Sequence, residues 1–303
     1  MNAKIKVAVM GCGHIGQSAI QAVQLAPDME LVGALDVPER CEDLKRYLRD
    51  VVVVADTQEL PEKPDVMVLT VPTRTVECVA PLLLAEGIHT VDCFDMHGEP
   101  FARLKASLDP VARAHNCAAV MGAGVDPGIS TMIRALFEVW APTGLTYVNY
   151  GPGMSMGHTV AAKSYPGVKD ALSITRPYDP GCHKRDLYLE LQPGADFDEV
   201  RRQILADPYF AHDDVRVFQV DDVTPLVDTG HRILVTRKGG SAGIHNQLLN
   251  FETTFHNPAS TAQVMIGAAR ACTRLAPGAH TMLEVPLAAL LPEPVEVLLK
   301  RLV

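Results

Sequence analysis

Apolar residues in the first part of the chain come in short continuous runs separated by amphipathic stretches. Continuous runs of valine, isoleucine and leucine are typical of parallel strands buried on both faces, and the stretches between them predict helices. The expected strands cover 5–10, 29–35, 51–54, 65–71, 87–93 and 117–121, and the expected helices cover 15–24, 73–85 and 100–114. The pattern predicts an α/β fold, a Rossmann-type doubly wound parallel sheet.

The hydrophobic pattern changes after Gly128, where polar and apolar residues alternate over longer stretches: "LTYVNYGPG", "HKRDLYLELQPG", "VRVFQVDDV" and "RILVTRKGG". This period of two predicts a mostly antiparallel sheet, with one helix near 196–206, and therefore a second, α+β domain. We expect a dinucleotide-binding domain over 1–125, completed by the segment 257–303, and a second domain over 126–256.

The expected C-terminal helix follows "HNPAS", with Asn257 as its N-cap, Pro258 at its first position and Gly278 as its stop. Small apolar residues along it share one face and predict that the helix packs back against the first domain. They are Ala262, Ile266, Ala269 and Cys272.

Composition narrows the class of protein. With 303 residues, 48% hydrophobic residues and a mean hydropathy of +0.10, the chain can bury the cores of about two domains. A net charge of −9 gives no broad basic field for nucleic acid or an anionic membrane. Seven scattered cysteines without a C-x-x-C pair favour neither a disulfide framework nor a zinc site. Because no apolar run resembles a signal peptide or a membrane span, we expect a soluble, cytoplasmic protein.

The stretch "VMGCGHIGQ" places Gly11, Gly13 and Gly16 in the spacing G-x-G-x-x-G, after a strand and at the start of a helix. The first glycine allows the tight turn, the second lets backbone amides approach a pyrophosphate, and the third lets helix and strand pack closely. We therefore expect dinucleotide binding here, with His14 and Ile15 also in the cofactor site.

Asp36 ends the next strand, twenty residues past Gly16. A carboxylate there binds ribose hydroxyls and repels a 2′-phosphate, which favours NAD over NADP. The alternative is that Asp36 caps the following turn "VPER" and that Arg40 accommodates a phosphate.

The stretch "TVPTRT" follows the fourth strand, at the sheet edge where dinucleotides lie in open α/β folds. Thr73 and Arg74 are candidates for contact with cofactor phosphates, and Thr70 and Pro72 belong to the same segment. The alternative is that Thr73 and Arg74 form an ordinary helix cap and a solvated first turn.

The stretch "MGAGVDPG", residues 121–128, carries three glycines and one carboxylate at the exit of the sixth strand. It lacks the helix-opening G-K-[ST] of a phosphate-binding loop. Asp95 leaves the fifth strand in "TVDCFDMH", and Asp126 leaves the sixth. Both carboxylates exit parallel strands at the same edge, so we expect them to converge. Without further information, Asp126 before Pro-Gly is more often a turn residue.

Here the chain resembles the meso-diaminopimelate dehydrogenases, especially the branch that also accepts D-amino acids. The likeness spans nearly the whole chain in order, through these motifs: "GxGxxG", "TVDxFDxH", "DPG", "YGPGMSMGHTVA", "GVKDALSIT", "HKR", "DPYF", "GH", "NPAS" and "LEVP". The resemblance implies NAD(P)-dependent, reversible oxidative deamination of meso-2,6-diaminopimelate at its D-centre to L-2-amino-6-oxopimelate (tetrahydrodipicolinate) and ammonia. The reverse direction would build a precursor for lysine biosynthesis or the cell wall.

The resemblance also implies roles for individual residues. Asp95 and Asp126 would hold the reacting amine, and the "MSMG" loop, with Met156 and Gly157, would offer amides to the neighbouring carboxylate. At the distal end of the substrate, Thr175, Arg185 and His231 would bind the carboxylate and Asn257 would bind the amine. Tyr150 and Val125 would also contact the substrate. The family further implies a homodimer formed through the second domain, and our candidate general base is a water held by Asp95 or Asp126.

The chain departs from the family pattern at two places. Val125 stands where family members have a tryptophan that walls the substrate, so we expect an altered site. The sequence "ALDVPE" stands where members that use NADP commonly carry arginines. Two alternatives remain: a reductase of another small amino or hydroxy acid, and a nucleotide-binding regulator without catalysis.

The histidines do not suggest a metal site. His158 in "MGHT" is expected to hold its loop in place. His97, His183, His245 and His256 lack the i, i+4 or carboxylate spacing of a metal site, so we expect no metal.

Overall fold

The computed structural model describes residues 3–211, 213–227 and 230–303 and divides into two compact units. Unit 1 comprises Met1–Met132 and Pro258–Val303, and unit 2 comprises Ile133–Asn257. The sequence analysis placed the divisions after residue 125 and before residue 257. Helices α5 (Ile129–Trp140) and α8 (Asn257–Cys272) run across the two points of division.

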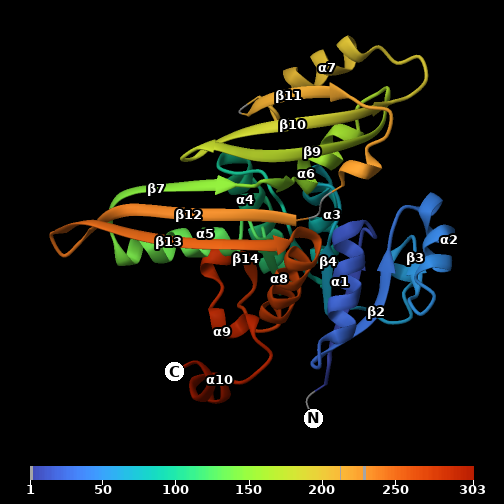
Figure 1. Ribbon diagram of the computed structural model, residues 1–303. Coiled ribbons are helices and arrows are strands. Elements are labelled where there is room, and N and C mark those ends of the chain that lie inside the picture. Colours follow the sequence, from blue (N-terminus) through green and yellow to red (C-terminus); the bar gives the residue numbers. More distant parts are fainter. Residues whose placement is uncertain (1–2, 212, 228–229) are drawn as a thin grey trace. The chain divides into compact units, whose positions relative to one another are not determined.

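Unit 1 is built on a seven-stranded sheet in the order β14-β6-β5-β4-β1-β2-β3, and each pair of neighbours is parallel. Figure 1 labels β2, β3, β4 and β14 of this sheet. The predicted parallel α/β layer is therefore confirmed. Its strands are β1 (Ile5–Met10), β2 (Met29–Leu35), β3 (Val53–Val54), β4 (Val66–Leu69), β5 (His89–Asp92), β6 (Ala118–Met121) and β14 (Gly278–Thr281).

The helices of unit 1 are α1 (His14–Leu25), α2 (Pro38–Tyr47), α3 (Thr73–Ala85), α4 (Glu99–Ala114), α8 and the short α9 (Leu287–Leu290) and α10 (Val295–Leu302), with 3-10 turns at Thr57–Glu59 and Met282–Glu284. Of these, α1, α3 and α4 agree with the expected helices to within a residue or two. Helix α2 was not expected from the sequence. Because it buries only Cys41 and Leu44, its apolar periodicity is weak.

Helix α8 completes the core of unit 1. Its residues Ala262, Ile266, Ala269 and Cys272, which the sequence places on one face, are all fully buried among the side chains of β1 and α1. Gly278 does not stop this helix, contrary to expectation, because α8 already ends at Cys272. Gly278 instead begins β14, and a Cβ there would lie 2.8 Å from the Asp109 carboxylate.

Unit 2 contains two sheets where the sequence predicted one. The first has the order β11-β10-β9-β8 and the second the order β13-β12-β7. All pairs are antiparallel except β10 with β11, so the predicted antiparallel character is confirmed. The strands are β7 (Thr143–Tyr150), β8 (Gly153–Met154), β9 (Val168–Asp179), β10 (Cys182–Leu191), β11 (Asp214–Gln219), β12 (Gly230–Ser241) and β13 (Ile244–His256).

Helices α6 (Met156–Lys163) and α7 (Phe197–Ala206) and a 3-10 turn at Thr224–Leu226 complete unit 2. Helix α7 begins where its sequence predicts, because the Asp196 carboxylate accepts hydrogen bonds from the N–H groups of Asp198 and Glu199. In the described ranges, none of the helices of either unit is long and apolar enough to cross a membrane.

Candidate functional site

The glycine motif of unit 1 forms a tight turn between β1 and α1. Gly11 has φ +94°, and a Cβ there would lie 2.7 Å from the carbonyl oxygen of Thr70. A Cβ on Gly16 would lie 1.8 Å from the carbonyl oxygen of Gly11. A Cβ on Gly13, by contrast, would meet no heavy atom within 4 Å. Two glycines are therefore required by packing, and the third leaves open space at the N-terminus of α1.

That open space fits the pyrophosphate of a dinucleotide. Helix α1 begins at His14, directly after Gly13, and the first N–H groups of a helix have no partner within it. Gly13 and His14 are exposed, and Ile15 is partly so. These amides and the helix dipole are what an anionic phosphate group requires.

Asp36 lies at the carboxyl end of β2 and contacts the same turn. Its Oδ2 accepts a hydrogen bond from the N–H of Cys12 at 2.7 Å, and its Oδ1 accepts one from Val37 N at 2.9 Å. The Arg40 guanidinium lies 3.2 Å from Oδ2 and is half-exposed. The contact with Val37 N is the one expected if Asp36 caps the following turn, and Arg40 is the residue expected in that case to accommodate a phosphate. The contact with Cys12 N links the carboxylate to the glycine turn.

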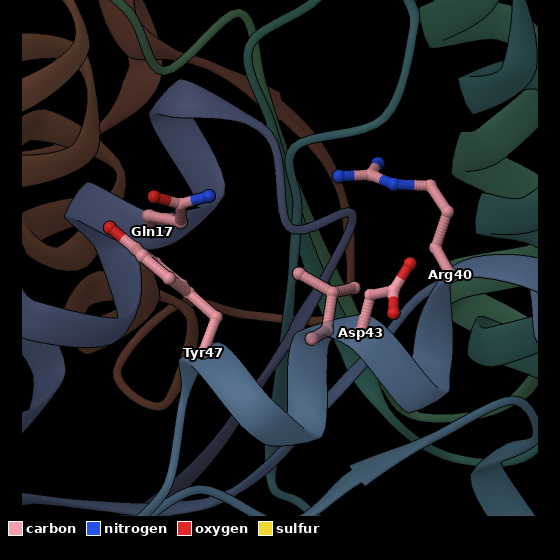
Figure 2. A pocket seen from close by; sticks show the side chains of 5 residues that line it. Gln17, Arg40, Asp43 and Tyr47 are labelled. Carbon is pink, nitrogen blue, oxygen red and sulfur yellow. The ribbon is translucent and has the colours of Figure 1, made fainter.

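A cavity of about 290 Å³ opens beside Arg40. Figure 2 shows Gln17 reaching it from α1, while Arg40, Asp43 and Tyr47 reach it from α2. Gln17 also donates a hydrogen bond to the carbonyl oxygen of Cys12 at 3.1 Å. Two of its lining residues thus contact the predicted cofactor segment: Gln17 contacts the glycine turn, and Arg40 contacts Asp36 after β2. The ribose end of a dinucleotide lies near the end of this strand in this class of fold.

The segment after β4 supports the glycine turn and reaches the first carboxylate. Thr70 Oγ1 donates hydrogen bonds to the carbonyl oxygens of Met10 and Gly11. Pro72 precedes α3, and Thr73 Oγ1 donates a hydrogen bond of 2.5 Å to Asp95 Oδ1. Thr70 and Thr73 thus have contacts inside unit 1, and Thr73 contacts a predicted catalytic residue.

The exit loops of β5 and β6, which carry Asp95 and Asp126, are adjacent. Ser130 donates a hydrogen bond to Asp126 Oδ1, and His97 Nε2 lies 3.4 Å from Asp126 Oδ2. The Asp126 side chain is only 10% exposed. His97 follows Asp95 by two residues, so its contact with Asp126 joins the two loops. The sequence spacing of His97 speaks only against a metal ligand, and no local pattern predicts this contact.

Asp92 also joins these loops, from a fully buried position that sequence reasoning missed. Its Oδ1 accepts hydrogen bonds from Phe94 N at 3.0 Å and Gly122 N at 2.9 Å, and its carbonyl oxygen accepts one from Ala123 N at 2.7 Å. Its Oδ2 has no hydrogen-bond partner among residues 3–211, 213–227 and 230–303. Burial raises the pKa of the Asp92 carboxyl to about 6.

Residues 122–128, which follow β6, form a compact loop. Gly122 has φ +61°, and Gly128, with φ +141°, forms a bridge to Gly124. A Cβ on Gly128 would lie 2.0 Å from the carbonyl oxygen of Gly124. Its glycines fold the loop around the half-buried Val125 and Asp126.

In unit 2, Arg185 and Thr175 lie opposite each other on β10 and β9. Arg185 Nη1 donates to Thr175 Oγ1 at 3.0 Å and lies 3.4 Å from Ser173 Oγ, and Arg185 Nε donates to Asp213 at 2.6 Å. Arg185 is 7% exposed, so it is not part of the solvated charge run that "HKRD" suggests by itself. Asp213 was not expected here, because it lies in a polar stretch before β11.

The other residues predicted to bind the distal end of the substrate surround the short strand β8. Gly153 pairs with Thr175, and a Cβ on Gly153 would lie 2.8 Å from the Cα of His231. Asn257 Nδ2 donates to the carbonyl oxygen of Met154 at 3.5 Å. The structure thus brings Thr175, Arg185, His231 and Asn257 together around one strand.

Tyr150, Met156 and Gly157 flank the same strand. Tyr150 ends β7, and its N–H donates to His183 Nε2 at 2.8 Å. Met156 and Gly157 begin α6 after Ser155. Burial lowers the pKa of His183, which keeps the imidazole neutral and able to accept this bond.

His158 holds its loop, as the sequence analysis expected of it. Its Nδ1 lies 3.0 Å from Ser155 Oγ, its Nε2 lies 3.5 Å from Asp213 Oδ2, and its ring contacts those of Tyr209 and Phe210. In the part of the chain that is described, no group of three His, Cys, Asp or Glu side chains is placed to hold a metal ion.

Comparisons with known proteins identify the family. The family model "Dihydrodipicolinate reductase, N-terminus" matches residues 5–93. The meso-diaminopimelate D-dehydrogenase of Bacteroides fragilis is 45% identical over 95% of this chain and 96% of its own. That of Ureibacillus thermosphaericus is 31% identical over 99% of both chains.

Several solved structures match nearly the whole chain. The dehydrogenase of C. glutamicum in complex with DAP has a TM-score of 0.86 at 26% identity, and the match covers 99% of this chain and 100% of that one. An engineered D-amino acid dehydrogenase bound to NADP+ has a TM-score of 0.85 at 25% identity, with the same coverage. Sequence and fold therefore agree along the full length, and the protein belongs to the meso-diaminopimelate dehydrogenase family.

Proposed function

We propose that the protein catalyses the NAD(P)-dependent, reversible oxidative deamination of meso-2,6-diaminopimelate at its D-centre. The products are L-2-amino-6-oxopimelate, ammonia and the reduced cofactor. The observation that carries the proposal is the 45% identity to a meso-diaminopimelate D-dehydrogenase over 95% of the chain. The glycine turn and carboxylates of unit 1 and the Arg185 cluster of unit 2 support it.

The residues of unit 1 supply the groups for the reacting centre. When bound, NAD(P) would supply its nicotinamide as the acceptor of the hydride from the D α-carbon. Asp95 and Asp126 accept hydrogen bonds from the substrate ammonium, and a water held by one of them takes the proton that the nitrogen must lose. The resulting imine adds water and releases ammonia, so the oxidised carbon ends as a ketone.

The residues of unit 2 supply the groups for the other end of the substrate. Arg185, Thr175 and His231 bind the distal carboxylate, for which the planar guanidinium offers paired donors. Asn257 binds the distal amine, and Met156 and Gly157 offer backbone N–H groups to the carboxylate beside the reacting carbon.

A direct assay tests the proposal. Purified protein is incubated with meso-2,6-diaminopimelate and either NAD+ or NADP+, and reduced cofactor is followed by absorbance at the same time as ammonia and the 2-oxo acid. We expect stoichiometric formation of all three products. Ammonia-dependent oxidation of the reduced cofactor with a panel of 2-oxo acids then tests the reverse reaction. No turnover in either direction would reject the proposal, and dinucleotide binding without amino-acid binding would favour a regulator.

The residue that follows β2, Asp36, bears on the preference between NAD and NADP. We infer a preference for NAD, because the Asp36 carboxylate borders the position of the ribose and repels a 2′-phosphate. Calorimetric dissociation constants for NAD+ and NADP+ test this. Arg40→Ala should weaken NADP+ binding more than NAD+ binding, and a strong wild-type preference for NADP+ would contradict the assignment to Asp36.

Val125 is our candidate for the breadth of substrate specificity. Its side chain is partly buried next to Asp126, and it is smaller than the tryptophan of the family pattern at this position. We infer that other D-amino acids are accepted. Val125→Trp should narrow the profile of D-amino acids toward meso-2,6-diaminopimelate, with Val125→Ile as the matched control, and an unchanged profile would remove Val125 from the specificity determinants.

A homodimer formed through unit 2 is our inference for the assembly. Strand β13 is an edge strand of thirteen residues in its sheet, and it exposes Ile244 and Leu248 by 66% and 60%. An open edge of this length favours pairing with a second copy about a two-fold axis. Sedimentation analysis should give a dimer, and Leu248→Lys should shift it toward the monomer.

We place the protein in the cytoplasm. The seven cysteine side chains form no disulfide in the structure, which suits a reducing compartment. Fractionation of cells that express the tagged protein would test this, and its recovery in an extracytoplasmic fraction would contradict it.

A further inference from the structure

Asp213 stands beside the predicted substrate-binding cluster of unit 2 and has no role in the proposed function so far. It lies directly before β11, which runs parallel to β10 with Asp214 opposite Lys184 and Val215 opposite Arg185. This register places the Asp213 carboxylate against the Arg185 guanidinium. The side chain of Asp213 is 23% exposed, whereas that of Arg185 is 9% exposed.

The ion pair between these residues is made along one atom pair only. Arg185 Nε donates to Asp213 Oδ2 at 2.6 Å, and His158 Nε2 approaches the same oxygen at 3.5 Å. The remaining hydrogen bonds of Arg185 in the described chain leave from Nη1, toward Thr175 and Ser173. Nη2 of Arg185 and Oδ1 of Asp213 therefore keep their capacity to donate and to accept.

A buried aspartate on the neighbouring strand β10, Asp186, provides a comparison, because both of its carboxylate oxygens are hydrogen-bonded. Asp186, whose side chain is 4% exposed, accepts from Arg176 through Oδ2 at 2.8 Å and from Arg216 through Oδ1 at 2.8 Å. Both of its oxygens are occupied by charged donors. The side chain of Asp213 is more exposed than that of Asp186, and its Oδ1 accepts no hydrogen bond from the described residues. Asp213 therefore differs from a carboxylate that serves only to hold the sheet together.

The open edge of the Arg185–Asp213 pair presents one positive and one negative group side by side. Nε and Nη2 of an arginine lie on the same edge of the guanidinium, so the donor at Nη2 and the acceptor at Oδ1 are neighbours. A free α-amino acid group carries a carboxylate and an ammonium on one carbon, and it is complementary in charge to this pair. His183 adds no charge nearby, because burial lowers its pKa.

We propose that Asp213 determines specificity for the zwitterionic distal end of the substrate: Arg185 binds the distal carboxylate while Asp213, together with Asn257, accepts a hydrogen bond from the distal ammonium. The inference rests on the proposed function and deepens it: among D-amino acid substrates, those whose far end is itself an amino acid are bound most tightly. Asp213 acts on binding, since it is assigned to the end of the substrate away from the reacting carbon.

Three substrates distinguish an Asp213 that binds the distal ammonium from an Asp213 that only orients Arg185. Meso-2,6-diaminopimelate has both distal groups, D-2-aminopimelate lacks the distal amine, and D-lysine lacks the distal carboxylate. kcat and KM are measured for each with the wild type, Asp213→Asn, Asp213→Glu and the control Asp214→Asn, whose exposed side chain pairs only distantly with Lys184, at 3.9 Å.

For Asp213→Asn we expect KM for meso-2,6-diaminopimelate to rise about 10- to 100-fold, as for the loss of a charged hydrogen bond, with little change in kcat. KM for D-2-aminopimelate should stay the same or fall, because Arg185 is released from its counter-ion. Asp213→Glu should restore part of the preference for meso-2,6-diaminopimelate, and Asp214→Asn should behave as the wild type.

Two results would overturn the inference. The first is an equal change of KM for meso-2,6-diaminopimelate and D-2-aminopimelate in Asp213→Asn, which would make Asp213 a residue that only orients Arg185. The second needs no variant: equal kcat/KM of the wild type for those two substrates. Wild-type protein that neither binds nor turns over meso-2,6-diaminopimelate would reject the proposed function itself, and this outcome is distinct from both.

Discussion

The two units hold their candidate site residues by different means. In unit 1 the groups come from loops at the carboxyl ends of parallel strands, and backbone amides and glycines fix the predicted cofactor end: Asp36 accepts from Cys12 N and Val37 N, and Gly11 has φ +94°. Asp95 and Asp126 lie on loops of the same kind and also contact the side chains of Thr73, Ser130 and His97. In unit 2 the groups lie on antiparallel strands, and side chains fix one another, as Arg185 contacts Thr175 and Asp213.

This difference predicts how each unit responds to substitution. A loop whose shape depends on backbone atoms fails when a side chain collides with it, whereas a side chain held by other side chains can be altered one contact at a time. Substitutions in unit 1 should therefore give larger effects, either on the chemistry or on folding. Those in unit 2 should give graded effects on substrate binding.

The largest effect is expected for Asp126→Ala. The substitution removes the carboxylate assigned to the reacting amine, and kcat/KM for meso-2,6-diaminopimelate should fall about 10²- to 10⁴-fold. The thermal midpoint should change little, because the side chain retains some exposure and its neighbours His97 and Ser130 are polar. Asp50→Ala, at an exposed turn of the same unit, is the matched control. Activity within threefold of wild type would exclude Asp126 from catalysis.

The glycines of the turn between β1 and α1 should separate folding from cofactor binding. Gly16→Ala places a Cβ 1.8 Å from the carbonyl oxygen of Gly11, so we expect destabilisation of about 3 kcal/mol in chemical denaturation. Gly13→Ala meets no atom of the protein and should change stability by less than about 1 kcal/mol.

For Gly13→Ala the effect should appear in binding instead. Its methyl group enters the space assigned to the pyrophosphate, so calorimetric affinity for NAD+ should fall about tenfold. Unchanged affinity would show that the dinucleotide does not lie against Gly13.

Asp92→Asn tests the buried carboxyl that joins the two exit loops of unit 1. Because burial raises the pKa of Asp92 to about 6, the folded protein holds a proton that the unfolded chain releases near pH 4. The stability that this group contributes is present below pH 4 and is lost as pH rises through 6. Between those values the free energy of unfolding of the wild type should fall relative to that of Asp92→Asn by roughly 2–3 kcal/mol.

Denaturant unfolding at several pH values measures this effect, and Asp109→Asn provides a control of opposite sign. Hydrogen bonds from Arg113 and Ala279 N hold the pKa of Asp109 below its usual range, so its contribution is lost on acidification. Parallel pH profiles for wild type and Asp92→Asn would show that Asp92 does not titrate in this window.

The smallest effect is expected in unit 2, for Thr175→Val. The isosteric change removes one hydrogen bond from Arg185 and leaves the others, at Ser173 and Asp213, in place. KM for meso-2,6-diaminopimelate should rise about tenfold with kcat changed less than threefold. Ser164→Ala, at an exposed helix end, is the control. A loss as large as that of Asp126→Ala would remove the contrast between the two units.

The sequence by itself determined the parallel layer, the glycine turn and the positions of Asp36, Asp95 and Asp126. Continuous apolar runs, glycine spacing and strand exits are local features, and each arises from residues close together in the chain. The motifs that resemble the meso-diaminopimelate dehydrogenases also run in order along the chain, and the comparisons confirm that family.

The tertiary structure alone decided which polar residues meet. Arg185 contacts Thr175 because β9 and β10 pair in one register, and Asp213 joins them because β11 lies on the other side of β10. His97 reaches Asp126 across two loops, and Asp92 is buried between Phe94 and Gly122. Such contacts depend on strand register and on packing between segments far apart in the chain, and no local pattern of residues specifies them.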